Sequence, residues 1–526
     1  MRALLFLLLA GLPVLVTGCQ SAARAAGPSD EALVAVQCAL GVDRLGAGAP
    51  GVSLQGARER AGTSTPVELS AWPGSAFQLV VGEGNARSVR GFDGAEAWAT
   101  DTRGVTRKQE LGGGAFLMLE GWARTQQWLG ELARRRWSAR PDPDTPDALR
   151  LVHRTSGVQV TVTLDPVTRR PARFSWQRLG RRRAIALEDW SQQGGLWLPM
   201  TVTETVDGEV VLVDRFDRRS RPRRAVARRS ASRPQDVAFQ GAGGVLPRSN
   251  VRFDRGGRAY VSANVDGKRD AWMLLDTGFG SHVISKAGAA RLSLRPLSSV
   301  ALHGVSGTAR TARLQGESLR LGALTQRAPT FVELDTAFLS ERAGFIVDGV
   351  LGAPLFDRTV VVIDDLRGQV EVHDPDRFDA PGLPWQPVRF DGTAPCVPGQ
   401  VRANGADTPL LWFRLDTGSD DTLTVSRWAV RAHGLAGDRA GLAPRQLAGP
   451  FGEVRGWRTS ASVVLLAGAN MGRQVITLLR DDLPGPLSDP WIAGNVGTRL
   501  LRGQRTVLDL RSGRVAVVAE DADRSG

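Results

Sequence analysis

The tripeptide Asp-Thr-Gly occurs twice in this sequence, beginning at Asp276 and again at Asp416. Each copy ends a mostly apolar run, which covers 272–275 in the first case and 411–415 in the second. Two carboxylates that face each other can share one proton and activate a water molecule between them, which is acid–base chemistry suited to hydrolysis. A chain that carries the motif twice in similar settings can build such a pair by itself, so the two aspartates are the candidate catalytic residues.

The segments around the two motifs also repeat. The glycine-bracketed apolar segment 349–352 (Gly-Val-Leu-Gly) recurs as 494–497 (Gly-Asn-Val-Gly). Ahead of the motifs, Asp-Gly at 266–267 and Asn-Gly at 404–405 are strong signals for hairpin turns. The internal repeat predicts two similar lobes, each with a hairpin, an Asp-Thr-Gly loop, further strands, a glycine-bracketed loop and a closing strand.

The repeat resembles the aspartic proteases, and the length of each lobe is closer to the retropepsin type than to the pepsin type. The resemblance covers about residues 248–520. It implies a mostly β fold with two acid-protease β-barrel lobes that form a pseudo-dimer within one monomeric chain. It also implies an aspartic endopeptidase that acts on a polypeptide substrate and needs no metal and no organic cofactor.

The resemblance assigns further site residues. In that family the glycine permits a tight turn, the threonine hydroxyls interlock beneath the two aspartates, and an apolar-apolar-Gly segment packs against the loop. Carried over to this chain, the active-site loops contain Thr277, Gly278, Thr417, Gly418 and Ser419, and the supporting loops contain Val350, Leu351, Gly352, Val496 and Gly497.

Three features depart from the family pattern. Asn495 replaces an apolar residue, and Phe279 follows the first motif where Ser or Thr is usual, as at Ser419. A hydroxyl at that position hydrogen-bonds the carboxylate and favours its ionised form, so we expect the pair to keep its proton to a higher pH than in acid proteases. The only tyrosine is Tyr260, so a pepsin-like flap tyrosine is absent. These departures leave open a second hypothesis, a non-catalytic lipoprotein that binds peptides or envelope polymer.

Family enzymes close a β-hairpin flap over the substrate. The candidate flap residues are Gly304, Val305 and Gly307 in the first lobe and Phe451 and Gly452 in the second. An ordinary surface hairpin is an equally good interpretation of both segments.

The N-terminus indicates export. After Arg2, residues 3–16 form an apolar run that is too short to span a bilayer. The run ends in Val-Thr-Gly-Cys19, which resembles the lipobox of bacterial lipoproteins and implies lipidation of Cys19 after cleavage. Because Gln20 follows, the resemblance favours a lipid anchor in the outer membrane that faces the periplasm. Nucleic acid is then a poor partner despite the formal charge of +13, and the arginine-rich stretch 218–233 is either a solvated linker or a contact for anionic headgroups.

The region before the repeat is predicted to be antiparallel and β-rich, with one strong helix over 114–137. Segments 92–98 and 164–168 resemble the half-barrel of periplasmic lipoprotein carriers of the LolA type, which implies a third hypothesis, lipid or lipoprotein binding through the N-terminal domain. For the two remaining cysteines, Cys38 and Cys396, a disulfide is open in the periplasm, but two buried thiols are the favoured expectation.

The expected domains are a signal peptide (1–18), a tether (19–34), a β-rich α+β domain (35–216), an arginine-rich linker (217–247), a first protease lobe (248–378) and a second (384–520).

Overall fold

The computed structural model describes residues 28–519 with short gaps. The gaps are 42–50, 61, 73–75, 84–86, 102–103, 127–135, 155–156, 194, 221–233, 268, 305–306, 439–441, 450–451 and 482–484. The predicted signal peptide, Cys19, most of the tether and most of the arginine-rich stretch therefore lie outside the described residues. The chain forms two compact units, Met1–Thr102 with Gly114–Arg229, and Arg103–Gly113 with Ser230–Gly526.

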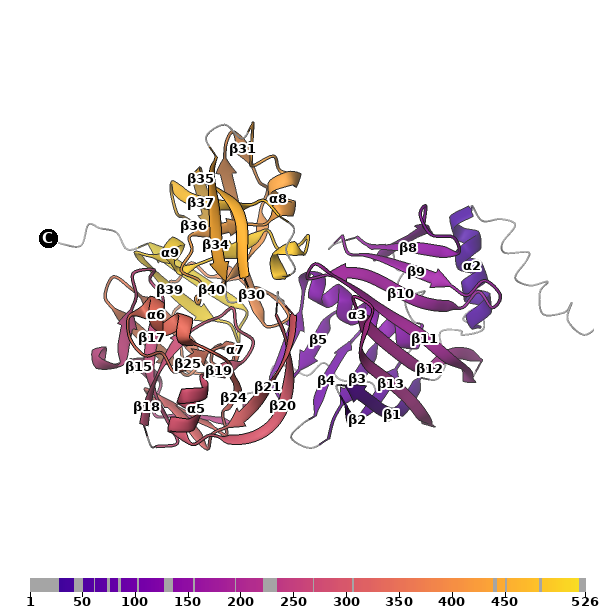
Figure 1. The fold of residues 1–526 in the computed structure, drawn as a ribbon, viewed down its shortest axis with the longest axis horizontal. Coiled ribbons are helices and arrows are strands. Elements are labelled where there is room, and N and C mark those ends of the chain that lie inside the picture. Colours follow the sequence, from indigo (N-terminus) through magenta and orange to yellow (C-terminus); the bar gives the residue numbers. More distant parts are fainter. Residues whose placement is uncertain are drawn as a thin grey trace, which may run out of the picture. The chain divides into compact units, whose positions relative to one another are not determined.

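The first unit is built on one antiparallel sheet, in which the strands follow the order β5-β4-β3-β2-β1-β13-β12-β11-β10-β9-β8-β7 (Figure 1). Neighbours in the sequence pair with each other, and β1 pairs with β13 to join the two ends of the unit. The elements are α2 (Pro28–Leu40), β1 (Val52–Arg60), β2 (Thr63–Ala71), β3 (Phe77–Val81), β4 (Ser88–Phe92), β5 (Ala97–Thr100), α3 (Leu111–Thr125), β7 (Trp137–Pro141), β8 (Ala148–His153), β9 (Gln159–Leu164), β10 (Pro171–Arg178), β11 (Arg181–Gln193), β12 (Leu196–Val206) and β13 (Glu209–Ser220).

Helix α3 packs on the inner face of this sheet. Phe116 stacks on Trp176 of β10, and Trp122 meets Phe92 of β4 edge to face. The predicted helix ends too late, because residue 126 is no longer helical and Trp137 begins β7. Since almost every described residue of α3 is buried, the helix occupies the inner face of the sheet as core.

A buried ion-pair cluster lies beneath this helix. Asp214 on β13 is fully buried and pairs with Arg58 at 2.6 Å and with Arg124 at 3.0 Å. Burial by itself raises the pKa of Asp214, but the two arginines outweigh it, so that the pKa is lowered and the carboxylate stays ionised.

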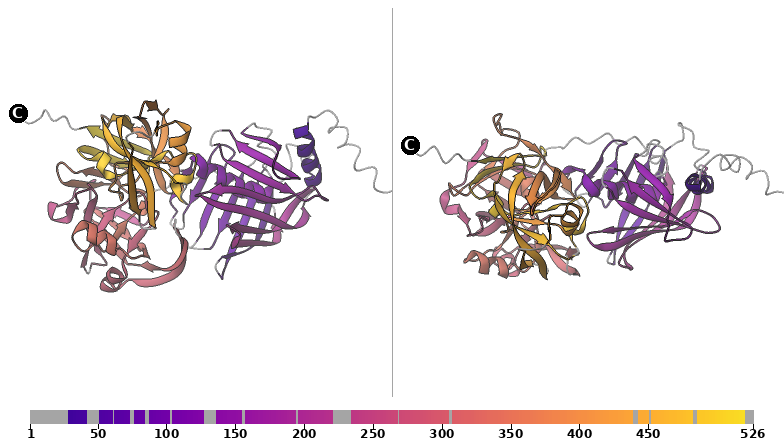
Figure 2. Two further views of the ribbon diagram at one scale, coloured as in Figure 1. Left: turned by 45° about the horizontal axis from the view of Figure 1, so that its top comes forward. Right: turned by 90° about the horizontal axis from the view of Figure 1, so that it is seen from above.

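The second unit contains two large sheets and a smaller one (Figure 2). The first large sheet, here called the β18 sheet, has the order β14-β23-β22-β17-β18-β25-β19-β24-β21-β20, with β16 paired to β17. Its elements are β14 (Val237–Phe239), β16 (Val251–Phe253), β17 (Ala259–Val265), β18 (Arg269–Leu275), β19 (His282–Ile284), α5 (Lys286–Leu292), β20 (Arg295–Gly304), β21 (Gly307–Gln315), β22 (Ser318–Leu321), β23 (Leu324–Arg327), β24 (Thr330–Glu333), α6 (Ala337–Ala343), β25 (Gly349–Leu351) and α7 (Ala353–Phe356).

The second large sheet, here called the β32 sheet, has the order β29-β30-β32-β38-β33-β37-β35-β34, with β31 and β36 at its side. Its elements are β29 (Arg389–Asp391), β30 (Ala394–Ala403), β31 (Ala406–Asp407), β32 (Leu411–Leu415), β33 (Leu423–Val425), α8 (Arg427–Ala432), β34 (Ala443–Gly449), β35 (Gly452–Leu466), β36 (Ala469–Asn470), β37 (Gln474–Leu479), β38 (Gly494–Val496) and α9 (Thr498–Leu501).

The smaller sheet takes strands from both parts of the repeat, in the order β15-β27-β26-β39-β40-β28. Its central pair joins β26 to β39, with Val361 opposite Leu508. Its strands are β15 (Gly243–Val245), β26 (Val360–Asp364), β27 (Gln369–His373), β28 (Gln386–Pro387), β39 (Gln504–Asp509) and β40 (Arg514–Ala519). The segment Arg103–Gly113, which includes β6 (Thr106–Gln109), also belongs to this unit, where Arg107 pairs with Asp357.

Local sequence signals shape the hairpins. Asp266 and Gly267 both have positive φ, and so do Asn404 and Gly405. Asn and Gly adopt this left-handed conformation more easily than other residues, so the two predicted turns form where the sequence places them. One turn joins β17 to β18 and the other joins β30 to β31.

Two cysteines lie among the described residues, and they differ in their state. Cys396 is a free, buried thiol as predicted, whereas Cys38 is disulfide-bonded, so the expectation of a thiol is wrong there. In the part of the chain that the structure describes, no helix is both long enough and apolar enough to cross a bilayer.

Candidate active site

Each Asp-Thr-Gly loop follows a strand that is flanked by a glycine-bracketed segment. Strand β18 pairs in parallel with β25, and β32 pairs in parallel with β38. At the loops the backbone N–H of Asp276 donates to Leu351 O at 3.1 Å, and that of Asp416 donates to Val496 O at 2.9 Å. The supporting segments expected from the sequence therefore hold the backbone of both aspartates.

The glycines of the supporting segments permit close backbone approach. A Cβ on Gly352 would lie 2.2 Å from Ser281 O, and a Cβ on Gly497 would lie 2.3 Å from Asp421 O. Neither oxygen belongs to a movable side chain, so any larger residue would push the motif loop away.

The two threonines interlock. The backbone N–H of Thr277 donates to Thr417 Oγ1 at 3.0 Å, and that of Thr417 donates to Thr277 Oγ1 at 3.1 Å. Each hydroxyl then donates across to the other strand, Thr277 to Leu415 O at 2.7 Å and Thr417 to Leu275 O at 2.9 Å. Both side chains are buried, so this closed set of four bonds joins the two motif loops.

The interlock brings the two carboxyl groups together. A Cβ on Gly418 would lie 2.2 Å from Asp276 Oδ2, and a Cβ on Gly278 would lie 2.5 Å from Asp416 Oδ1. Each motif glycine thus leaves space for the carboxyl group of the opposite aspartate. Each also donates its N–H to its own aspartate, Gly278 at 2.7 Å and Gly418 at 3.2 Å.

The pKa of Asp276 lies far above its ordinary value. Burial, followed by the negative charge of Asp416, raises it to about 8. Two carboxylates in contact cannot both ionise easily, so a buried pair of this kind holds one proton and one charge.

One hydrogen-bond donor to the aspartate pair was not predicted from the sequence. Asn495 Nδ2 donates to Asp416 Oδ2 at 3.1 Å. The hydroxyl of Ser419, which was expected to hold this carboxylate, accepts instead from Asp421 N at 3.4 Å. The role expected for Ser419 therefore falls to Asn495, whose polar side chain in an apolar pattern was the signal in the sequence.

Arg414 was also not predicted as a site residue from the sequence. It lies two residues before Asp416, and its guanidinium donates to Gly278 O of the opposite loop. Its charge lowers the pKa of Asp276, against the larger effects of burial and of Asp416. Its Nε is buried without a hydrogen-bond partner. An arginine inside the apolar run 411–415 was the available clue.

The other sequence departures are explained by packing. Phe279 packs against an apolar cluster that includes Tyr260 and Val350. The Tyr260 hydroxyl donates to Asp254 Oδ2 at 3.2 Å, so this tyrosine is a core residue. Asp421, which lies five residues after Asp416, is largely buried and accepts from Arg445 at 2.8 Å and from Thr424 at 2.7 Å.

The flap candidates lie at the tips of two hairpins. Gly304 is opposite Gly307 at the end of the long curved β20–β21 hairpin (Figure 1). Gly452 is opposite Gly449 at the end of the β34–β35 hairpin. Val305 and Phe451 lie outside the described residues.

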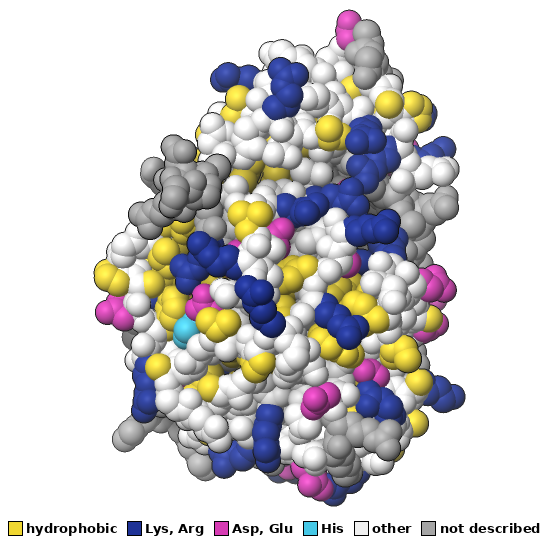
Figure 3. Space-filling model, turned by 90° about the vertical axis from the view of Figure 1, so that its left-hand side faces the viewer, with side chains coloured by type: hydrophobic (Ala, Val, Ile, Leu, Met, Phe, Trp, Pro, Cys, Tyr) yellow, Lys and Arg dark blue, Asp and Glu magenta, His cyan; other side chains and the backbone are white. Residues whose placement is uncertain are grey.

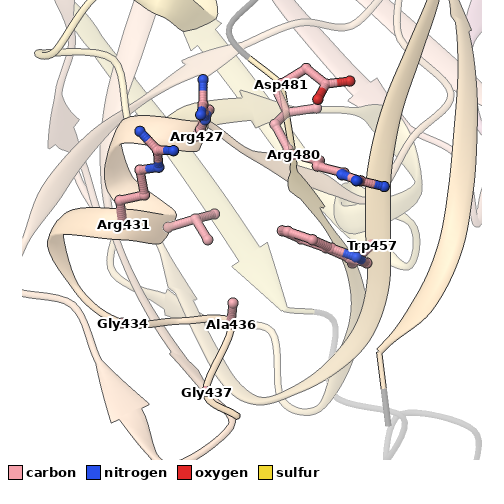
Figure 4. Close-up of a pocket in the computed structure, with 10 residues that line it drawn as sticks. Arg427, Arg431, Gly434, Ala436, Gly437, Trp457, Arg480 and Asp481 are labelled. Atoms are coloured by element: carbon pink, nitrogen blue, oxygen red, sulfur yellow. The ribbon is translucent and has the colours of Figure 1, made fainter. Parts of the chain in front are cut away.

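A pocket of about 380 Å³ lies elsewhere in the β32 sheet. Arg427 and Arg431 of α8 form one side, and Trp457 and Arg480 form the other (Figure 4). Neither Asp276 nor Asp416 lines it. Basic side chains are also spread over the face seen in Figure 3, among acidic and apolar ones.

Comparison with known families agrees with this geometry. Residues 261–355 match the family model described as aspartyl protease. The match covers the first motif and its supporting segment, and it ends before Asp416. No curated protein matches the chain. The matched segment thus resembles an aspartyl protease domain, and it lies within a part of the chain that is mostly β.

Proposed function

We propose that the protein is a single-chain aspartic endopeptidase in which Asp276 and Asp416 together activate one water molecule. The observation that carries the proposal is the closed threonine interlock, which joins the two motif loops and sets the carboxyl groups in contact. The raised pKa of Asp276 supports it, because hydrolysis by such a pair needs one protonated and one ionised carboxyl group.

The reaction balances on this pair alone. The ionised carboxylate takes a proton from the water molecule, and the oxygen of the water bonds to the peptide carbonyl carbon. At the same time the protonated carboxyl group gives its proton to the carbonyl oxygen. The resulting diol collapses as the C–N bond breaks. The leaving nitrogen receives the proton taken from water, and one diol hydroxyl returns its proton to the other aspartate, which restores the starting state.

The proposal includes two retropepsin-like lobes that form a pseudo-dimer. Support comes from matching arrangements in the two large sheets, where β25 lies between β18 and β19 just as β38 lies between β32 and β33. The smaller sheet, with β26 paired to β39, would hold the lobes together. Because one chain supplies both aspartates, the enzyme would act as a monomer.

The substrate would lie over the pair beneath the two hairpin tips. The β20–β21 and β34–β35 hairpins end in paired glycines, Gly304 with Gly307 and Gly449 with Gly452. Paired glycines let the backbone of each tip approach a peptide closely. We propose that both hairpins are flaps, with lobe side chains providing the subsites.

We further propose that the mature chain is anchored in the bacterial outer membrane by a lipid on Cys19, on the sequence motif alone. Lipidation uses the sulfur atom of Cys19, so the modification of this residue is what the test has to measure. The intact mass of protein extracted from membranes decides, since added acyl mass supports the anchor and an unmodified N-terminus rejects it.

The activity is tested by incubating the full chain with a diverse peptide library from pH 4 to pH 8 and reading new termini by mass spectrometry. We expect cleavage by the wild type and none by Asp276→Asn or Asp416→Asn. Asp335→Asn is the matched control, because Asp335 is an exposed carboxylate that accepts from Ala337 N, a bond that the amide keeps. A folded wild type that cleaves nothing would point to the binding hypothesis instead.

A further inference from the structure

The two aspartates have different neighbours at corresponding positions. In the β18 sheet, Leu274 lies opposite Val350 in the parallel pair β18–β25. In the β32 sheet, the same two positions hold Arg414 and Asn495. An apolar pair next to Asp276 is thus replaced by a polar pair next to Asp416.

The difference extends across a whole layer, by which we mean these two positions and the residues paired with them on the neighbouring strands. In the β18 sheet, Tyr260 pairs with Leu274 and Val283 pairs with Val350, and all four belong to one buried apolar cluster. The corresponding partners in the β32 sheet are Cys396 opposite Arg414 and Thr424 opposite Asn495. The repeat therefore keeps its backbone arrangement and changes the chemistry next to one aspartate only.

Asn495 gives Asp416 a hydrogen bond that Asp276 lacks. The glycine N–H donors are matched, because each motif glycine donates to its own aspartate. The amide of Asn495 adds a bond to Asp416 Oδ2 at 3.1 Å, whereas Val350 has no donor to offer. A hydrogen bond donated to a carboxylate stabilises its charged form, so the extra donor favours ionisation of Asp416.

The orientation of the amide fits this interpretation. The Oδ1 atom of Asn495 is buried without a hydrogen-bond partner. Turning the amide over would place this oxygen against a carboxylate oxygen, and two acceptors repel each other unless one carries a proton. The orientation with the N–H toward Asp416 is the one that suits an ionised carboxylate.

We propose that Asn495 is a positioning residue that keeps Asp416 ionised and leaves the shared proton on Asp276. The catalytic consequence rests on the proposed function. Asp416 becomes the base that takes the proton from water, and Asp276 becomes the acid that protonates the carbonyl oxygen. The two otherwise equivalent aspartates thereby receive fixed roles at the start of each cycle.

The other ionisable groups in this layer do not reverse the assignment. Arg414 favours an ionised Asp276, but burial and Asp416 outweigh it. The thiol of Cys396 faces this layer, and burial raises its pKa, so it stays neutral. The negative charges of Asp391 and Glu110 also raise the pKa of this thiol. Arg414 is thus the cation that acts on Asp276, and it lies in the same layer as Asn495.

The test follows the two carboxyl carbons directly and needs no substrate. The full chain is labelled with ¹³C at aspartate Cγ, and the signals are assigned with Asp276→Asn and Asp416→Asn and titrated from pH 4 to pH 9. We expect the Asp416 signal at the carboxylate position at pH 6 and the Asp276 signal at the protonated position. In Asn495→Val, the Asp416 signal at pH 6 should move toward the protonated position, because this carboxylate loses the donor that Asn495 provides.

Two variants separate this effect from general disturbance. Thr424→Val removes a polar group from the residue paired with Asn495, but its hydroxyl donates to Asp421, so both signals should titrate as in the wild type. Val350→Asn places a donor beside Asp276 and should shift the Asp276 signal toward the carboxylate position, which gives an answer even where Asn495→Val fails to fold.

The outcomes also separate this inference from the proposed function. Unchanged signals in Asn495→Val, or an equal change in Thr424→Val, overturn the inference even where the wild type cleaves peptides. The expected signals together with no cleavage by any form reject the proposed endopeptidase and leave the inference standing. Where cleavage occurs, the acid limb of the kcat/KM profile should move in Asn495→Val and stay in place in Thr424→Val.

Discussion

Thr277 and Thr417 each accept a hydrogen bond from the backbone N–H of the other, at 3.1 Å and 3.0 Å. Each hydroxyl also donates to the strand end of the opposite motif. The arrangement satisfies buried donors and acceptors from both loops at once, so neither loop can move without leaving polar groups unpaired. The proximity of the two aspartates is therefore a consequence of this interlock.

Replacing either threonine by valine should destabilise the site. Thr277→Val or Thr417→Val leaves a buried N–H and a buried carbonyl without partners, which costs about 1–3 kcal/mol for each group. The free energy of unfolding, measured by denaturant titration, should fall, and any cleavage should fall with it. Thr277→Ser and Thr417→Ser keep the hydroxyl and should stay close to the wild type, and equal losses in the serine variants would argue against the interlock.

The pH dependence of stability should reveal the shared proton. In the unfolded chain Asp276 ionises near its ordinary pKa of about 4, whereas in the folded protein it keeps its proton to about pH 8. The folded state binds more protons between these values, so the stabilisation is fully present below about pH 4 and is lost as the pH rises through about 8. Asp276→Asn cannot ionise and should remove this slope, gaining stability relative to the wild type as the pH rises.

Thermal unfolding from pH 4 to pH 9 measures this difference. Asp335→Asn alters an exposed carboxylate and should give a curve parallel to that of the wild type. A constant difference between the wild type and Asp276→Asn over this range would show that Asp276 titrates normally in the folded protein.

The motif glycines should not tolerate a methyl group. A Cβ at Gly418 would lie 2.2 Å from Asp276 Oδ2, so Gly418→Ala should force the two carboxyl groups apart. We expect cleavage to fall at least about a hundredfold, because the loss disables acid–base catalysis. Gly382→Ala is the control, since a Cβ there meets no atom within 4 Å. Normal cleavage by Gly418→Ala would contradict the close approach of the pair.

The first unit should depend on its buried ion cluster. Asp214→Leu leaves Arg58 and Arg124 buried without their shared carboxylate, and breaking a buried pair by removing one partner costs about 3–5 kcal/mol. The unfolding transition of this unit should shift to lower denaturant. Glu59→Leu removes an exposed carboxylate on β1 that pairs with Arg215 and should cost less than about 1 kcal/mol. Similar losses in the two variants would contradict the importance of burial.

Much of the site could be predicted because its signals are local. The two motifs, the glycine-bracketed segments and the turns at 266–267 and 404–405 are short patterns whose geometry depends on their own residues. The contact of Asn495 with Asp416 is different, because it depends on the parallel pairing of β32 with β38, which no local pattern specifies. The sequence marked Asn495 only as a poor fit to an apolar pattern.

The first unit shows the same limit. A strong amphipathic pattern predicted a helix over 114–137, but periodicity does not show where a chain leaves the helix and joins a sheet, and Trp137 begins β7. Arg103–Gly113 lies within the expected domain 35–216 and yet belongs to the second unit. Its ion pair between Arg107 and Asp357 links residues too distant in the sequence for any local signal.

The most direct test of the central claim is whether Asp276 and Asp416 of one chain form a single active site. Cleavage of a peptide substrate is measured for Asp276→Asn, for Asp416→Asn and for an equimolar mixture of the two. The account predicts that both variants lose at least about a hundredfold in kcat/KM and that the mixture stays inactive, because every chain lacks one member of its own pair. Full activity in Asp416→Asn, or recovery on mixing, would contradict it.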